Sequence, residues 1–409
     1  MNMSVQRVIK IGFTFILFIA MIYGVIGCGQ RDGEGKSITG TKSSLPFGLT
    51  PEEQTVFKSI DAVIAIQEEG VREKDSAIYL TTIDSSNATY LNEATYLAHR
   101  LAYADISDFN MNLLGISIEE DGSAIAEIQQ SYKLNDQLNA VTYHERFLKS
   151  GSSWLDHDVA FDEKEVGVVK VFYMPEVGNP ESFIVLIEKS LENVDATFPD
   201  SLTENVEIKL YSDRELLRQK TDLGIAWLFT GWSEEGHAIK AFTGREPEYN
   251  YEALFTHELI HRLTISVSKG NMPIWFAEGL AIHYGTFKIK GSTYMEEGTV
   301  SMDALKIPVE ELSETHLERL TDQTEILTYY ATAGMVIRYL AETYGDDQVF
   351  ALYQALGNYP FNDIASDPAW GQHSDERLRA VLQDILNLDM TELSEGYLEW
   401  IELQPEGGQ

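Results

Sequence analysis

The sequence carries HELIH at residues 257–261 and WFAEG at residues 275–279. On a helix, residues four positions apart lie on the same face, so the side chains of His257 and His261 can converge on one cation. A catalytic zinc ion takes three protein ligands and keeps one position for water. Glu278, seventeen positions after His261, would supply the third ligand. The two segments therefore predict a pair of helices with a zinc ion between them.

Glu258 lies beside the predicted histidine ligands and is a candidate general base. Bound Zn²⁺ lowers the pKa of its water, and a neighbouring carboxylate can accept the remaining proton as the water attacks a carbonyl. Residues 251–266 are amphipathic, and residues 269–273 break this pattern. Pro273 is suited to begin a second helix, which would carry Glu278. The alternative is that the histidines are ordinary packing side chains and Glu278 is a solvated helix residue.

The pairing of HELIHRL with PIWFAEGLA resembles the gluzincins, the two-helix zinc peptidases, and most closely the bacterial peptidase MA-like domains. The resemblance covers roughly residues 169–403. It implies a thermolysin-like zincin domain with a mainly helical C-terminal part. Position by position, it implies that His257, His261 and Glu278 bind Zn²⁺. It also implies that Glu258 is the base that shuttles the proton.

A tyrosine on a later helix completes the family's site by stabilising the developing oxyanion. Tyr330, in TYYATAG at residues 328–334, fits that motif best. Tyr329 is adjacent, and either ring could instead be a packing aromatic on an apolar helix face. The chain also departs from the thermolysin-like pattern, which has an aspartate four residues after the third ligand. Ile282 stands there, so the group that would orient a histidine is unassigned.

Residues 234–242 contain a short alternating segment, after His237, that resembles the family's edge strand above the cleft. Such an edge can hold an extended peptide through backbone hydrogen bonds, which do not read sequence. The role of His237 itself stays open. His283 lies five positions after Glu278 and would point away from that residue's face, so it is predicted to be a packing or surface side chain.

The first residues of the chain predict where this chemistry takes place. Arg7 and Lys10 precede an apolar run over residues 11–27, an order typical of a secretory signal. The run ends in VIGC, which resembles a bacterial lipobox, so residues 1–27 would be removed and Cys28 acylated. The alternative is an uncleaved transmembrane anchor. Both place the rest of the chain outside the cytoplasm, and acylation would anchor it to the extracytoplasmic face of the cell membrane.

Cys28 is the only cysteine, which excludes an intramolecular disulfide. Residues 28–49 are rich in Gly, Ser, Thr and charge, and predict a flexible tether. Removing residues 1–27 takes the formal net charge from −35 to −37, because they carry two basic residues and no acidic one. A surface this negative repels nucleic acid and anionic lipid. We therefore expect no nucleic-acid partner, and membrane attachment through the lipid anchor.

Residues 50–165 predict an α+β domain of their own. TPEE at residues 50–53 supplies a helix cap, a first-turn proline and two acids, and the helix would run to about Glu73. Helical sequence recurs around residues 90–103. Strands are then predicted at residues 110–118, 123–132, 140–148 and 152–161. Helices followed by an antiparallel meander resemble the cone-shaped cystatin-like or SnoaL-like domains. We expect this domain to act as a spacer or to present substrate.

Residues 166–409 then form the predicted gluzincin domain, which is mainly helical from Leu312 to Leu403. Two hypotheses about function follow. One is a membrane-tethered zinc metallopeptidase that hydrolyses peptide or protein substrates outside the cell. The other is a catalytically weak or inactive zincin-fold lipoprotein that acts as a binding or sensor module. Glu258 favours the first hypothesis, because a purely structural metal site needs no base.

Overall fold

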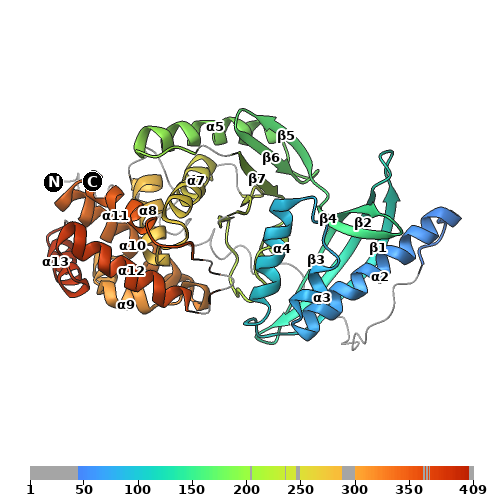
Figure 1. The fold of residues 1–409 in the computed structure, drawn as a ribbon, viewed down its shortest axis with the longest axis horizontal. Helices are drawn as coiled ribbons and strands as arrows, with labels where there is room; N and C mark the ends of the chain where they lie inside the picture. The colour runs from blue at the N-terminus through green and yellow to red at the C-terminus, as the bar shows by residue number, and fades with distance from the viewer. Residues whose placement is uncertain are drawn as a thin grey trace, which may run out of the picture. The chain divides into compact units, whose positions relative to one another are not determined.

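The computed structural model describes residues 45–404, except for residues 203–204, 235, 246–248, 288–299, 363, 365–366 and 368. The predicted signal segment 1–27, Cys28 and the tether as far as residue 44 lie outside the described residues. None of the described helices combines the length and apolar character that crossing a bilayer requires. The fold of the described chain is a mixture of α and β structure, with an antiparallel sheet first and helices last (Figure 1).

Helix α2 (Pro51–Glu73) packs against an antiparallel sheet, and together they form two layers (Figure 1). The predicted cap is present: Thr50 and Glu53 accept hydrogen bonds from each other's backbone N–H groups. Phe57 and Ile60 of α2 share a core with Ile128 of the sheet. The predicted antiparallel meander is confirmed among the described residues, in the order β1 (Ile106–Ile118), β2 (Ala124–Leu134), β3 (Gln137–Ser150) and β4 (Ser153–Val159).

Two shorter helices, α3 (Ser76–Leu80) and α4 (Ala88–Arg100), connect α2 to this sheet. A second, mixed sheet follows. Three of its strands run parallel, β6 (Val169–Tyr173), β7 (Val206–Tyr211) and β9 (Ile239–Phe242), and the described edges are β5 (Asp162–Val166) and β8 (Gly231–Trp232). The predicted boundary between residues 165 and 166 falls inside β5, and residues 43–409 cluster as one compact unit.

The edge of this second sheet differs from the prediction. The alternating segment after His237 forms β9, which pairs with β7 on one side and with β8 on the other. The two-residue strand β8 is the edge in its place. A strand of two residues has too few positions to show an alternating pattern, which is why the sequence pointed to β9 instead.

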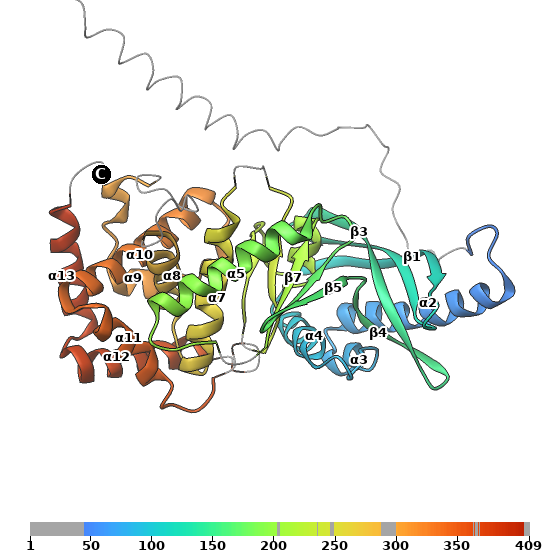
Figure 2. The ribbon, with the colours of Figure 1, turned by 90° about the horizontal axis from the view of Figure 1, so that it is seen from above.

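Helices α5 (Pro180–Thr197) and α6 (Arg214–Gln219) accompany the second sheet, and α5 packs on α7 (Tyr251–Ser268), as Figure 2 shows. Helix α8 (Ile274–Ile282) continues into a π-helical turn, η1 (His283–Phe287). The remaining described helical elements are η2 (Met302–Leu305), α9 (Val309–Glu314), η3 (Leu317–Arg319), α10 (Gln323–Tyr344), α11 (Asp346–Leu356), α12 (Trp370–Leu386) and α13 (Met390–Glu402).

The turn between α7 and α8 is fixed by buried polar contacts. The predicted helix pair is confirmed, since α7 covers the amphipathic segment and Pro273 stands directly before α8. Lys269 and Gly270 adopt positive φ angles of 54° and 69°, which end α7 and reverse the chain. The amide nitrogen of Asn271 donates hydrogen bonds to the carbonyls of Leu356 and Pro360. These contacts tie the turn to the end of α11.

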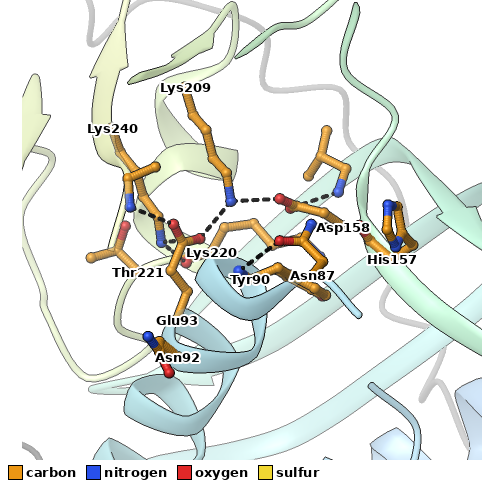
Figure 3. Close-up of polar contacts among 12 residues, drawn as sticks. Asn87, Tyr90, Asn92, Glu93, His157, Asp158, Lys209, Lys220, Thr221 and Lys240 are labelled. Atoms are coloured by element: carbon orange, nitrogen blue, oxygen red, sulfur yellow. Dashed lines mark hydrogen bonds and ion pairs between the residues drawn. The ribbon is translucent and has the colours of Figure 1, made fainter. Parts of the chain in front are cut away.

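A buried cluster of ion pairs joins the first sheet to the second (Figure 3). Glu93 of α4 and Asp158 of β4 both pair with Lys209 of β7, at 2.8 and 2.5 Å. Glu93 also lies 3.3 Å from the ammonium of Lys240 on β9. Burial would raise the pKa of Glu93, but the two lysines outweigh burial and lower it to about 2. Glu93 is therefore a buried carboxylate that stays charged.

Candidate metal centre

Three predicted ligands meet at one point in the structure. The Nε2 atoms of His257 and His261 are 3.0 Å apart. Oε2 of Glu278 lies 3.3 Å from the first of these nitrogens and 3.2 Å from the second. Within the described chain, these residues form the group with the spacing of a metal site. The sequence prediction of which side chains converge here is consistent with this geometry.

The convergence follows from helix geometry and from one close helix contact. The histidines are four positions apart on α7 and therefore project from the same face. Glu278 comes from α8, which packs between α7 and α10. A side chain at Gly279 would place its Cβ 2.6 Å from the carbonyl oxygen of Ala333 on α10. The absence of that side chain lets α8 lie close enough to α10 to hold Glu278 at the histidines.

The donor set fits a divalent cation. His257 and His261 are 3% and 6% exposed, so bulk water has little access to either imidazole. Two nitrogen atoms 3.0 Å apart repel each other through their lone pairs unless a proton or a cation lies between them. Two imidazoles with one carboxylate are a donor set typical of a catalytic metal site that keeps an open position. These residues could hold a metal ion.

The three side chains are electrostatically linked: burial would lower the pKa of His261, but the nearby carboxylates, Glu278 foremost, outweigh burial and raise it. Burial would raise the pKa of Glu278, but the charge of His261 and the contacts with both histidines together outweigh burial and lower it to about 2. Burial lowers the pKa of His257, which favours the neutral imidazole that binds metals. Among the described residues, Nδ1 of His261 has no hydrogen-bond partner. The partner that usually orients a metal-binding histidine is therefore not found there, in keeping with Ile282 standing where thermolysin-like enzymes have an aspartate.

Glu258 is enclosed between α7 and strand β8. Its side chain is 3% exposed, and its Oε2 atom finds no hydrogen-bond partner in the described part of the chain. Burial raises the pKa of Glu258 to about 8, although the positive charge on His261 opposes the shift. A Cβ atom at Gly231 would lie 2.1 Å from Oε1 of Glu258. Gly231 therefore leaves the space that this carboxylate occupies.

The two candidate tyrosines have different surroundings. Tyr329 is buried, and its hydroxyl has no hydrogen-bond partner among the residues described. Burial, followed by the negative charge of Glu278, raises the pKa of Tyr329, so this phenol lies within electrostatic reach of the metal site. Tyr330 is half-buried and packs at the margin of the core. Burial and the electrostatic influence of Glu278 thus favour Tyr329 as the candidate phenol, whereas the sequence motif favours Tyr330.

The other histidines near the motif have packing contacts. His283 is buried in the π-helical turn, with its ring edge-on to Tyr284 at 4.6 Å. It is not part of the described metal-ligand group, as the sequence predicts. The ring of His237 meets Tyr96 of α4 edge-on at 5.3 Å.

The sequence did not reveal a small polar cavity between the first sheet and residues 219–223. Glu145 and Asp156 both accept a hydrogen bond from the hydroxyl of Tyr90, and Lys220 pairs with Glu145 at 2.7 Å. Tyr79 lines the same cavity of about 20 Å³. That volume suits a water molecule and not a substrate. One signal in the sequence could have indicated it. Glu145 occupies an inward-facing position of β3, in alternation with the buried residues Tyr143 and Phe147.

No family model matches the chain, and no curated protein matches it.

We predict that the described ligand set binds a divalent metal ion and stabilises the fold. Purified protein should carry about one zinc ion per chain by mass spectrometry, because two buried imidazoles and one half-buried carboxylate converge. Zinc at 100 times its dissociation constant should raise the free energy of unfolding by about 2.7 kcal/mol. The His261→Gln variant should lose both effects, whereas His316→Gln, at an exposed histidine, should keep them. Equal metal content in the two variants would contradict the assignment.

Proposed function

We propose that this protein is a zinc metallopeptidase of the gluzincin type, with His257, His261 and Glu278 as the zinc ligands. The observation that carries the proposal is the buried carboxyl group of Glu258 beside three converging metal donors. A structural metal site has no need of an acidic side chain held without a hydrogen-bond partner at Oε2. A hydrolase needs such a group to carry a proton.

In this proposal a bound zinc ion supplies Lewis acidity and lowers the pKa of water at the site. Glu258 accepts a proton from that water and later delivers it to the leaving amine. Burial suits it to this role, because a carboxyl group with a raised pKa holds and releases protons near neutral pH. The hydroxyl of Tyr329 then donates a hydrogen bond to the developing oxyanion, and Tyr330 remains the alternative donor.

An extended peptide fits the edge of the second sheet. Strand β8 pairs with β9 on one side and with no described strand on the other. Gly231 in β8 lies against Glu258, so a peptide lying along this edge would run past the general base. Backbone pairing of this kind favours peptide substrates without strong sequence preference.

The proposed location is the extracytoplasmic face of the cell membrane, through acylation of Cys28. This part of the proposal rests on the order of features in the first residues: basic residues, then an apolar run, then the VIGC motif. The likeness of the first domain to cystatin-like or SnoaL-like cones, and of the second to thermolysin-like zincins, is part of the same proposal.

Replacing the general base should separate chemistry from metal binding. Glu258→Gln keeps the shape of the side chain but cannot accept a proton, so the rate of cleavage of a peptide library should fall at least about 100-fold. Zinc content should stay at the wild-type level, because Glu258 is not a ligand. A Gln variant that cleaves as fast as the wild type would contradict the peptidase proposal and favour a binding or sensor module.

Filling the space beside the base should have a related effect. Gly231→Ala would place a methyl group 2.1 Å from Oε1 of Glu258 and 2.9 Å from Leu254, so the carboxyl group must move. We expect kcat to fall roughly 10- to 100-fold, since misplacing a catalytic group by about 1 Å has effects of that size. Gly371→Ala, where nothing lies within 4 Å of the added Cβ, is the control and should keep wild-type kcat.

The two tyrosines should respond differently to loss of the hydroxyl. We predict that Tyr329→Phe lowers kcat about 100-fold or more, the usual effect of removing an oxyanion donor. Tyr330→Phe should stay within about threefold of the wild type, because its ring packing is kept. Steady-state kinetics on one cleaved peptide measures both. The reverse order would assign the role to Tyr330, and two unchanged rates would remove the tyrosine from the mechanism.

A further inference from the structure

The hairpin formed by β8 and β9 lies directly beside the proposed general base. Gly231 of β8 leaves the space that Glu258 occupies, and Gly231 pairs with Ala241 of β9. Trp232, the other residue of β8, pairs with Lys240. A strand of two residues makes few ladder hydrogen bonds and is marginally stable by itself. The position of β8 beside Glu258 therefore depends on what holds β9 and the connecting residues.

Helix α4, from the first domain, holds this hairpin through one of its faces. Oε1 of Glu93 accepts a hydrogen bond from the backbone N–H of Ala238, at 3.0 Å, directly before the start of β9. The same carboxylate pairs with Lys240 (Figure 3). The side-chain amide of Asn92 donates to the carbonyl of Gly236, at 3.2 Å, at the turn between the strands.

The same face extends along the helix. Tyr96, three positions after Glu93, contacts the ring of His237. The hairpin is thus held at its turn, at the start of β9 and within β9 by residues of a single helix.

The C-terminal end of α4 contacts a second segment of the chain, η3. Arg100 pairs with Glu318 of η3 at 2.6 Å and with Asp222 at 2.7 Å. Element η3 leads into α10, which carries Tyr329. One helix of the first domain therefore contacts both the hairpin beside Glu258 and the segment before the helix that carries the tyrosine. A simple spacer domain would need neither contact.

We infer that α4 is a positioning element of the metal site, and that Glu93 and Asn92 act through the β8–β9 hairpin to hold Glu258 in place. This inference rests on the proposed peptidase function. It makes the first domain an integral part of the catalytic unit. Neither Glu93 nor Asn92 contacts the metal ligands in the described structure, so both are positioning residues.

Two variants of different severity test this inference. Glu93→Gln removes the buried charge that the lysines face, and Asn92→Ala removes an exposed contact without leaving a buried charge unpaired. Thr95→Ala is the matched control, because among the described residues the Thr95 hydroxyl donates only to the carbonyl of Leu91 in its own helix. Each variant is made in the full chain. If Glu93→Gln does not fold, Asn92→Ala decides the outcome.

Amide hydrogen exchange measures the local stability of the hairpin without relying on enzyme activity. Peptides covering residues 231–242 should exchange about fivefold faster in Asn92→Ala than in wild type, the effect of losing one hydrogen bond, and faster still in Glu93→Gln. Thr95→Ala should leave this exchange unchanged. If exchange is unchanged in all three variants, α4 does not hold the hairpin and the inference is overturned.

Steady-state kinetics then distinguishes a role in positioning Glu258 from a role in stability alone. We expect kcat on a peptide that the wild type cleaves to fall roughly 3- to 10-fold in Asn92→Ala, with KM within about twofold and zinc content unchanged. Faster exchange with wild-type kcat would overturn the positioning role and leave the contacts purely structural. A wild type that binds zinc but cleaves no peptide would contradict the proposed function, and with it the positioning role, before any variant is compared.

Discussion

The site depends on one close contact, between helices α8 and α10 at Gly279. No side chain separates the backbone of Gly279 from the carbonyl of Ala333, and α8 therefore lies where neighbouring Glu278 can reach the histidines of α7. Metal–ligand distances tolerate deviations of about 0.2 Å, which is far less than the space that one methyl group would require. The apolar packing of three helices and the geometry of a polar site are thus set by the same contact.

Burying the site also costs hydration free energy for its ionisable side chains. Glu258, His257 and His261 are each shielded from water, so the charged form of each loses several kcal/mol of hydration, which only a nearby partner can offset. The ligand residues offset part of that loss among themselves, through the 3.2 and 3.3 Å contacts to Glu278. Glu258 finds no such partner at Oε2. Ion pairing offsets the loss of hydration in the buried cluster between the two sheets as well, where Lys209 and Lys240 face Glu93 and Asp158.

Local patterns predicted much of this structure, and long-range contacts account for the rest. The histidine spacing predicts α7, the break before Pro273 predicts α8, and Thr50 with Glu53 predicts the start of α2. The two-residue strand β8 has no such local pattern, and the space beside Glu258 depends on Gly231, far away in sequence. Tyr329 and Tyr330 differ by about 100° around one helix, so only the packing of α10 decides which ring turns towards Glu278.

The central claim is that two imidazoles and one carboxylate bind a single zinc ion, and anomalous diffraction at the zinc absorption edge tests it most directly. Crystals grown with zinc should give one strong peak within about 2.0–2.2 Å of Nε2 of His257, Nε2 of His261 and a carboxylate oxygen of Glu278. The absence of a peak between these three atoms, or a main peak at other residues, would contradict the account.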